Sequence, residues 1–139
     1  MMACEKEIED DEPKGPISNT PYIELRNISP NDINQFESVT FSIFYRDGDG
    51  DIGFDSADSI SLWITDERFP LTQGFHIPPL SPVDTAISIQ GTFKVDLNNV
   101  ILKNPDASDE TVQFTVELKD RAGNSSNIVR SEAITVKSN

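Results

Sequence analysis

Residues 39–53 have the sequence VTFSIFYRDGDGDIG, which joins a strand pattern to an acidic loop. Four apolar or aromatic residues alternate along the first half: Val39, Phe41, Ile43 and Tyr45. Because successive side chains of a strand point to opposite faces, these four share one face. In the second half aspartate alternates with glycine, and glycine permits the backbone to curve tightly. The stretch therefore predicts a half-buried β-strand that ends in an acidic loop.

The same two-residue alternation recurs along the chain between turn signals. It is found in residues 22–26, 59–65, 86–97 and 112–118 and in a last strand that ends at Val136. In residues 59–65 it places Ile60, Leu62 and Ile64 on the buried face and Trp63 on the other. Gly91 interrupts the apolar series of residues 86–97, which predicts a bulge or break there.

These strands are short, and no window has a sustained 3.6-residue apolar period. Residues 66–83 contain four prolines and predict a long connection without a central strand. About seven strands in a domain of roughly 100 residues predict an all-β fold. We expect an immunoglobulin-like antiparallel β-sandwich over residues 21–139, and a partly open barrel is the alternative.

Length and charge argue against several classes of function. The chain has 139 residues, the length of a single domain, and a net charge of −13. This charge disfavours nucleic acid, whose phosphates bind Lys and Arg, and electrostatic adsorption to anionic lipid. No apolar run approaches the roughly 20 residues that a membrane-spanning helix needs.

The N-terminal residues have the composition of a tether. Residues 1–20 are acidic and then rich in Pro, Gly, Ser and Asn, without periodicity. The segment Met1-Met2-Ala3-Cys4 resembles the end of a bacterial lipobox, and Cys4 is the only cysteine. The sequence thus predicts a lipid anchor on Cys4 that attaches the chain to a membrane. The alternative is an acidic disordered tail with an incidental cysteine.

The acidic loop is a candidate metal site. Five aspartates lie within residues 47–58, and a hard divalent cation bound by oxygen removes the repulsion between them. In a seven-stranded sandwich, the second and sixth loops lie at the same end, which brings Asp120 and Asn124 close. We expect Asp47, Asp49 and Asp51 to bind Ca²⁺, with Asp55 and Asp120 completing the shell and Asp58 and Asn124 as further candidates.

Two other interpretations of this loop are weaker. An EF-hand requires glycine where this chain has Ile52, and its flanking elements are helices. A solvated Asp-Gly hairpin turn remains the structural alternative, because Asp-Gly is a frequent turn former. Mg²⁺ fits less well, since it prefers fewer carboxylates and retains more water.

Two motifs resemble those of a known group of proteins. FSIFYRDGDGDIG (residues 41–53) and DRAGNSSN (residues 120–127) are similar to Bacteroidetes surface lipoprotein domains and, more loosely, to bacterial Ig-like and cadherin-like repeats. The resemblance covers about residues 22–137. It implies a β-sandwich that is lipid-anchored at the bacterial outer membrane, on the cell surface or the periplasmic face.

Catalysis has little support in the sequence, and we expect the protein not to be an enzyme. The single histidine, His76, lies in the proline-rich segment without a nucleophile motif. Phe69 and Phe75 form a candidate surface for a glycan or protein ligand, or else they cover the core. The sequence predicts a non-catalytic module for surface binding or scaffolding with a structural calcium site. The alternative is a carbohydrate-binding accessory domain of a polysaccharide-uptake system.

Overall fold

The computed structural model describes residues 18–82 and 86–139, which form β-strands and no helix. Within these residues, therefore, no helix has the length and apolarity needed to cross a membrane. Cys4 and the first 17 residues of the expected tether lie outside the described residues.

Residues 18–82 and 86–139 form ten strands. They are β1 (Tyr22–Ser29), β2 (Asp32–Asn34), β3 (Val39–Asp47), β4 (Leu62–Asp66), β5 (Leu71–Phe75), β6 (Ile89–Leu97), β7 (Asp109–Val112), β8 (Phe114–Leu118), β9 (Val129–Arg130) and β10 (Ile134–Lys137).

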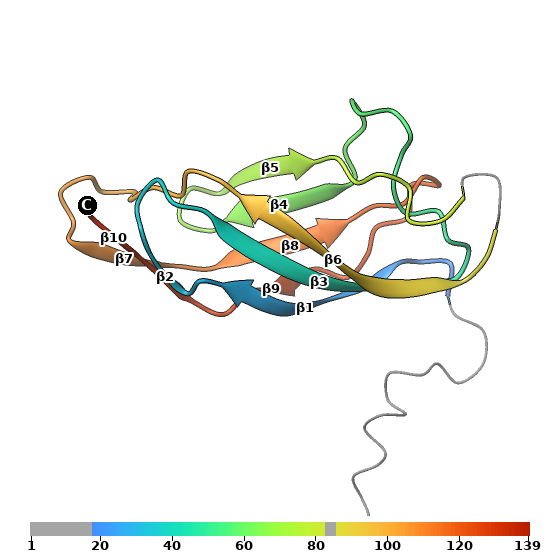
Figure 1. Ribbon diagram of the computed structural model, residues 1–139, viewed down its shortest axis with the longest axis horizontal. Coiled ribbons are helices and arrows are strands. Elements are labelled where there is room, and N and C mark those ends of the chain that lie inside the picture. The colour runs from blue at the N-terminus through green and yellow to red at the C-terminus, as the bar shows by residue number, and fades with distance from the viewer. Residues whose placement is uncertain (1–17, 83–85) are drawn as a thin grey trace, which may run out of the picture.

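The strands form the two layers of a sandwich (Figure 1). One layer has the order β1-β3-β6, and the other has the order β5-β4-β8-β9. A third set, β2-β10-β7, extends the second layer, because Gln113 alone separates β7 from β8 and β10 follows β9. Counting β1/β2, β7/β8 and β9/β10 as three interrupted strands beside four single ones gives seven strand positions. The expected immunoglobulin-like sandwich of about seven strands is confirmed.

The core lies between the layers and follows the predicted alternation. Along β3, Val39, Phe41 and Ile43 are fully buried. Phe41 contacts Phe114 of the opposite layer edge to face, with ring centroids 5.3 Å apart. Aromatic pairs of this geometry add about 0.5–1.5 kcal/mol beyond the area that they bury.

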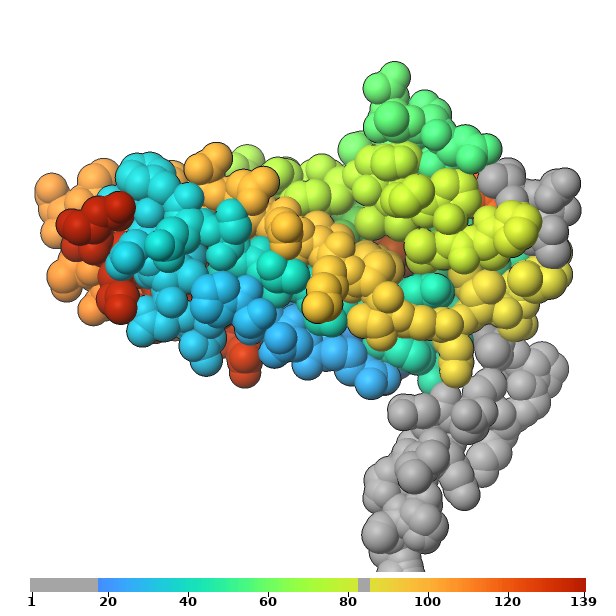
Figure 2. Space-filling model, viewed as in Figure 1, coloured from blue at the N-terminus to red at the C-terminus, as the bar shows by residue number. Residues whose placement is uncertain are grey.

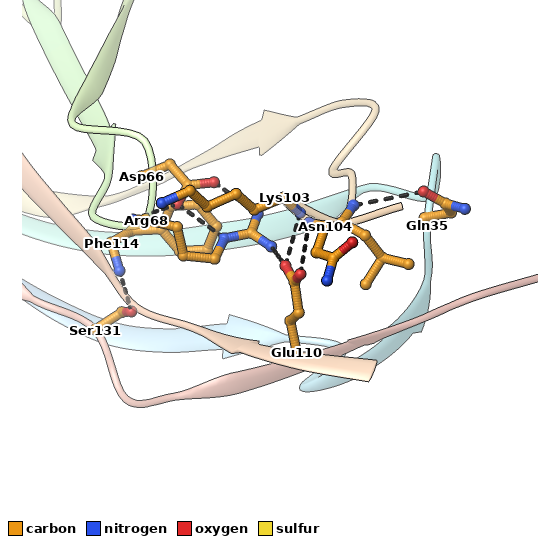
Figure 3. A network of polar contacts seen from close by, with 9 residues as sticks. Gln35, Asp66, Arg68, Lys103, Asn104, Glu110, Phe114 and Ser131 are labelled. Atoms are coloured by element: carbon orange, nitrogen blue, oxygen red, sulfur yellow. Dashed lines mark hydrogen bonds and ion pairs between the residues drawn. The ribbon is translucent and has the colours of Figure 1, made fainter. Parts of the chain in front are cut away.

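A half-buried ion-pair network closes one end of the sandwich, next to β7 (Figure 3). Arg68 lies between two carboxylates, with Nη2 2.8 Å from Asp66 Oδ2 and Nη1 2.7 Å from Glu110 Oε1. Glu110 also accepts hydrogen bonds from the backbone N–H groups of Lys103 and Asn104. The connection after β6 is thereby attached to the second layer.

The expected bulge at Gly91 is wrong. The β3–β6 register runs without a shift from Val39 opposite Leu97 to Asp47 opposite Ile89. Gly91 instead makes room for a neighbour, because a Cβ there would lie 2.8 Å from the hydroxyl oxygen of Tyr45.

Two local expectations around β4 also need correction. The proline-rich segment contributes no central strand, as predicted, but it is more than a connection, because its residues between Pro70 and the later prolines form an edge strand, β5, that pairs with β4. Ile60 is 39% exposed and Ser61 is buried, contrary to the prediction, whereas Leu62 and Ile64 are buried as predicted. The reason is that Ile60 packs over Gly74 on the outer face, where a Cβ would approach it to 2.6 Å.

Candidate metal centre

Two of the candidate aspartates occupy core positions at the ends of strands. Asp47 continues the inward series of β3 after Ile43 and Tyr45, and its side chain is fully buried. Asp120 continues the inward series of β8 two residues after Leu118, and it is 1% exposed. One aspartate therefore ends a strand of the first layer, and the other follows a strand of the second. The period of two that builds the core brings them together.

Asp49 and Asp51 lie in the loop that follows β3. Gly50 and Gly53 have positive φ angles of 68° and 97°, a backbone conformation that glycine adopts without steric cost. The backbone N–H of Asp51 donates to Asp47 Oδ2 at 2.9 Å and folds the loop over the end of β3.

Contacts with distant segments fix the path of the loop. Ile52 is fully buried, and its carbonyl accepts a hydrogen bond from the Leu80 N–H at 3.1 Å. The carbonyl of Asp51 accepts from the Arg121 N–H at 2.9 Å, and the Arg121 guanidinium donates to the carbonyl of Gly53. These bonds use the loop carbonyls and leave the carboxylates facing one another.

The turn that carries Asp120 is held by its own side chains. Asn124 donates to Asp120 Oδ1 from its backbone N–H at 2.7 Å and to Oδ2 from its side-chain amide at 3.2 Å. Gly123 closes the turn with a φ of 92°. Asn124 therefore orients Asp120, and both residues lie where the sequence placed them, beside the acidic loop.

Four carboxylates converge at this end of the sandwich. Asp47, Asp49, Asp51 and Asp120 each present an oxygen, and these oxygens lie within 4.8 Å of one another. Three oxygens, Oδ1 of Asp47, Asp49 and Asp51, are buried and have no hydrogen-bond partner. A buried polar atom without a partner costs about 1–3 kcal/mol, and more when it is charged. The hydrogen bonds of the cluster thus leave these three carboxylate oxygens without a donor.

The environment opposes ionisation of two of these groups. Burial raises the pKa of Asp47 to about 6, and the negative charge of Asp49 adds to the increase. Burial raises the pKa of Asp51 to about 8, and the nearby carboxylates of Asp49, Asp47 and Asp120 add to the increase. The Arg46 guanidinium lies 5.3 Å from the ring centre of Tyr22 on the outer face of the sheet.

A divalent cation would change this balance. Calcium takes six to eight oxygen ligands at about 2.3–2.6 Å, so two ligands on opposite sides of one ion are about 4.6–5.2 Å apart. Oxygens within 4.8 Å of one another can all reach such an ion. The four side chains therefore fit a cation that takes only oxygen ligands.

The structure does not bring Asp55 and Asp58 into this cluster. Both are exposed, and they lie beyond Gly53, where the chain projects from the body of the domain (Figure 2, green). The expectation that Asp55 completes the shell is not met, because residues 52–54 pair with residues 77–80 and turn away from Asp47.

The candidate aromatic surface is divided between two environments. Phe75 is half-buried and packs against the core. The ring of Phe69 lies 5.1 Å from the Arg68 guanidinium and lines a cleft at the ion-paired end of the sandwich. His76 Nδ1 lies 2.9 Å from the carbonyl oxygen of Ser59 and holds the start of β4. These side chains do not form one shared patch.

Comparison with protein-family models, with curated proteins and with solved structures found no match for this chain.

Proposed function

We propose that this chain is a non-catalytic binding or scaffolding module whose β-sandwich is clamped by a calcium ion. The observation that carries the proposal is the set of three buried, unpartnered carboxylate oxygens beside Asp120. The residues that would bind the ion come from both layers, since Asp47 ends β3 and Asp120 follows β8. An ion at this point would tie the two layers together, and its role would be structural.

The choice of calcium follows from the donors. All four are carboxylates, which suit a hard cation, and zinc would favour His or Cys ligands. Four carboxylates exceed the one or two that magnesium normally takes while it keeps bound water. Bidentate carboxylates and water would complete the six to eight oxygen ligands that calcium requires.

The location of the module is a separate part of the proposal. The lipobox-like segment before Cys4 supports a lipid anchor on a bacterial outer membrane, and Cys4 lies outside the described residues. Expression of the full reading frame in a Bacteroidetes host tests this part. We expect membrane fractionation that Cys4→Ser abolishes, and a soluble wild-type protein would contradict the anchor.

Thermal unfolding with and without the ion tests the calcium site. A ligand that binds only the folded state stabilises it by about 2.7 kcal/mol when its concentration is 100 times Kd. We expect CaCl₂ to raise Tm by several degrees relative to EDTA, and MgCl₂ to raise it less. Isothermal titration calorimetry with CaCl₂ then gives the stoichiometry and Kd.

Two variants of the same loop make a matched pair. Asp49→Asn removes a buried carboxylate of the cluster, whereas Asp58→Asn changes an exposed carboxylate nearby. We expect the first to abolish the calcium-dependent rise in Tm and the second to preserve it. Equal Tm values in EDTA and CaCl₂ for the wild-type chain would overturn the calcium site.

A further inference from the structure

A groove runs over the outer face of the second layer, opposite the core. Its volume is about 360 Å³, and its lining includes Trp63, Thr65, Thr115, Glu117, Lys119 and Ser125. We call it the Trp63 groove. Trp63 of β4 lies opposite Glu117 of β8 on one side and Gly74 of β5 on the other. The floor of the Trp63 groove is therefore made of paired strands, whose backbone is rigid.

The indole of Trp63 extends over the neighbouring edge strand. Its Nε1 atom lies 3.5 Å from the position that a Cβ would take at Gly74, so this glycine leaves space for the ring. The side chain is half-buried, and Nε1 donates to no other residue within the described parts of the chain. The groove thus offers an apolar ring surface and one available N–H donor.

The charged groups of the groove are also available to a ligand. Glu117 and Lys119 are two residues apart and line the same face. Neither forms an ion pair or side-chain hydrogen bond with another residue that the structure describes. Their charges cancel, although the whole chain has a net charge of −13. The groove accordingly suits a neutral ligand that both donates and accepts hydrogen bonds.

We propose that the Trp63 groove binds a neutral oligosaccharide. A pyranose ring has an apolar C–H face that packs on an aromatic ring, and its hydroxyls bond with carboxylate, ammonium and hydroxyl groups. An extended peptide fits less well, because β4 pairs along its whole length with β5 and β8 and offers no free edge beside Trp63. This inference goes beyond the structural calcium site and does not depend on it.

Fluorescence of the full chain tests the proposal directly, because Trp63 is the only tryptophan. Cellohexaose, xylohexaose, mannohexaose and maltohexaose are titrated in buffer with calcium, after a screen on an array of neutral glycans. We expect a saturable change in Trp63 emission with at least one neutral glycan. Calorimetry with that glycan gives Kd for the wild-type chain and its variants.

Variants locate the binding surface. Trp63→Ala should abolish binding, and Glu117→Gln should weaken it about tenfold, because the amide replaces a charge-assisted hydrogen bond with a weaker neutral one. Leu71→Ala is the control, because Leu71 is a 66% exposed apolar residue of β5 that does not line the groove. It should leave Kd unchanged.

Three results would overturn the proposal. They are no binding to any neutral glycan by a folded wild-type chain, unchanged Kd in Trp63→Ala, and loss of binding in Leu71→Ala. Circular dichroism checks that each variant is folded. If Trp63→Ala unfolds, Trp63→Phe and Glu117→Gln replace it, and unchanged Kd in both would also refute the site.

Discussion

The acidic cluster predicts that the ion-free protein becomes less stable as pH rises from 5 to 8. Asp47 and Asp51 have folded-state pKa values of about 6 and about 8, against 3.8 as their ordinary value. A carboxyl whose pKa is higher in the folded state binds more protons there than in the unfolded chain. The unfolding free energy must then fall as pH rises between the two pKa values.

The size of the effect follows from Asp47. At pH 5 the folded state holds nearly one proton more at this group than the unfolded chain does, and at pH 6 it holds about half a proton more. A difference of one whole proton over one pH unit is about 1.4 kcal/mol, so Asp47 alone contributes about 1 kcal/mol. Asp51 adds in the same direction over the whole interval to pH 8. The pKa values of Glu67 and Glu110 are lowered in the folded state, so these groups change the unfolding free energy mainly below pH 5.

Urea unfolding measures this prediction. The free energy of unfolding is obtained in EDTA and in saturating CaCl₂ at pH 5, 6, 7 and 8. We expect a decrease of more than about 1 kcal/mol in EDTA. Saturating calcium should cancel this decrease in unfolding free energy, because the ion binds the deprotonated carboxylates of Asp47 and Asp51 and therefore binds more tightly as pH rises. Asp51→Asn should flatten the EDTA curve.

A free energy in EDTA that is constant or rises between pH 5 and 8 would refute the reasoning. It would mean that Asp47 and Asp51 bind no more protons in the folded ion-free protein than in the unfolded chain. Asp58→Asn is the control for the mutation, because it changes the charge of the same loop outside the cluster.

Three further substitutions test what positions the site and closes the fold. Gly53→Ala should destabilise the ion-free protein by about 1–3 kcal/mol in urea and weaken calcium binding by calorimetry, because φ is positive and a Cβ would meet the Pro78 carbonyl. Arg68→Met should cost about 1–3 kcal/mol of unfolding free energy by leaving the half-buried carboxylates of Asp66 and Glu110 without their cation, and it should leave calcium affinity unchanged. Phe114→Ala should cost about 3–5 kcal/mol by thermal or urea unfolding, because it empties a fully buried site. Values within 0.5 kcal/mol of wild type, the usual range for surface changes, would contradict each assignment.

The fold was predictable because it depends on a period of two. Alternation along β3 and β8 is visible in the sequence, and it correctly gives the inward faces. The same alternation, extended by one step, also reaches Asp47 and Asp120. The position of Asp120 beside the acidic loop follows from topology, since the loop after β3 and the turn after β8 lie at the same end of the sandwich (Figure 1).

What the sequence did not predict depends on contacts between distant residues. Asp55 has the same chemistry as Asp51, but the loop leaves the cluster because Phe54 pairs with Ile77. Gly91 is indistinguishable from a bulge glycine until Tyr45 is seen to fill the space above it. Neither relation has a signal in the local sequence.

The two ends of this sandwich treat acidic side chains differently. At one end Arg68 contacts both Asp66 and Glu110, so the carboxylates are neutralised within the chain. At the other end Asp51 and its neighbours have unpartnered buried oxygens, and their negative charges and burial raise its pKa. Hydrophobic side chains at Asp47 and Asp120 would have extended the core at no electrostatic cost. We therefore expect the carboxylates at these two inward positions to make the stability of this end of the sandwich depend on a cation from solution.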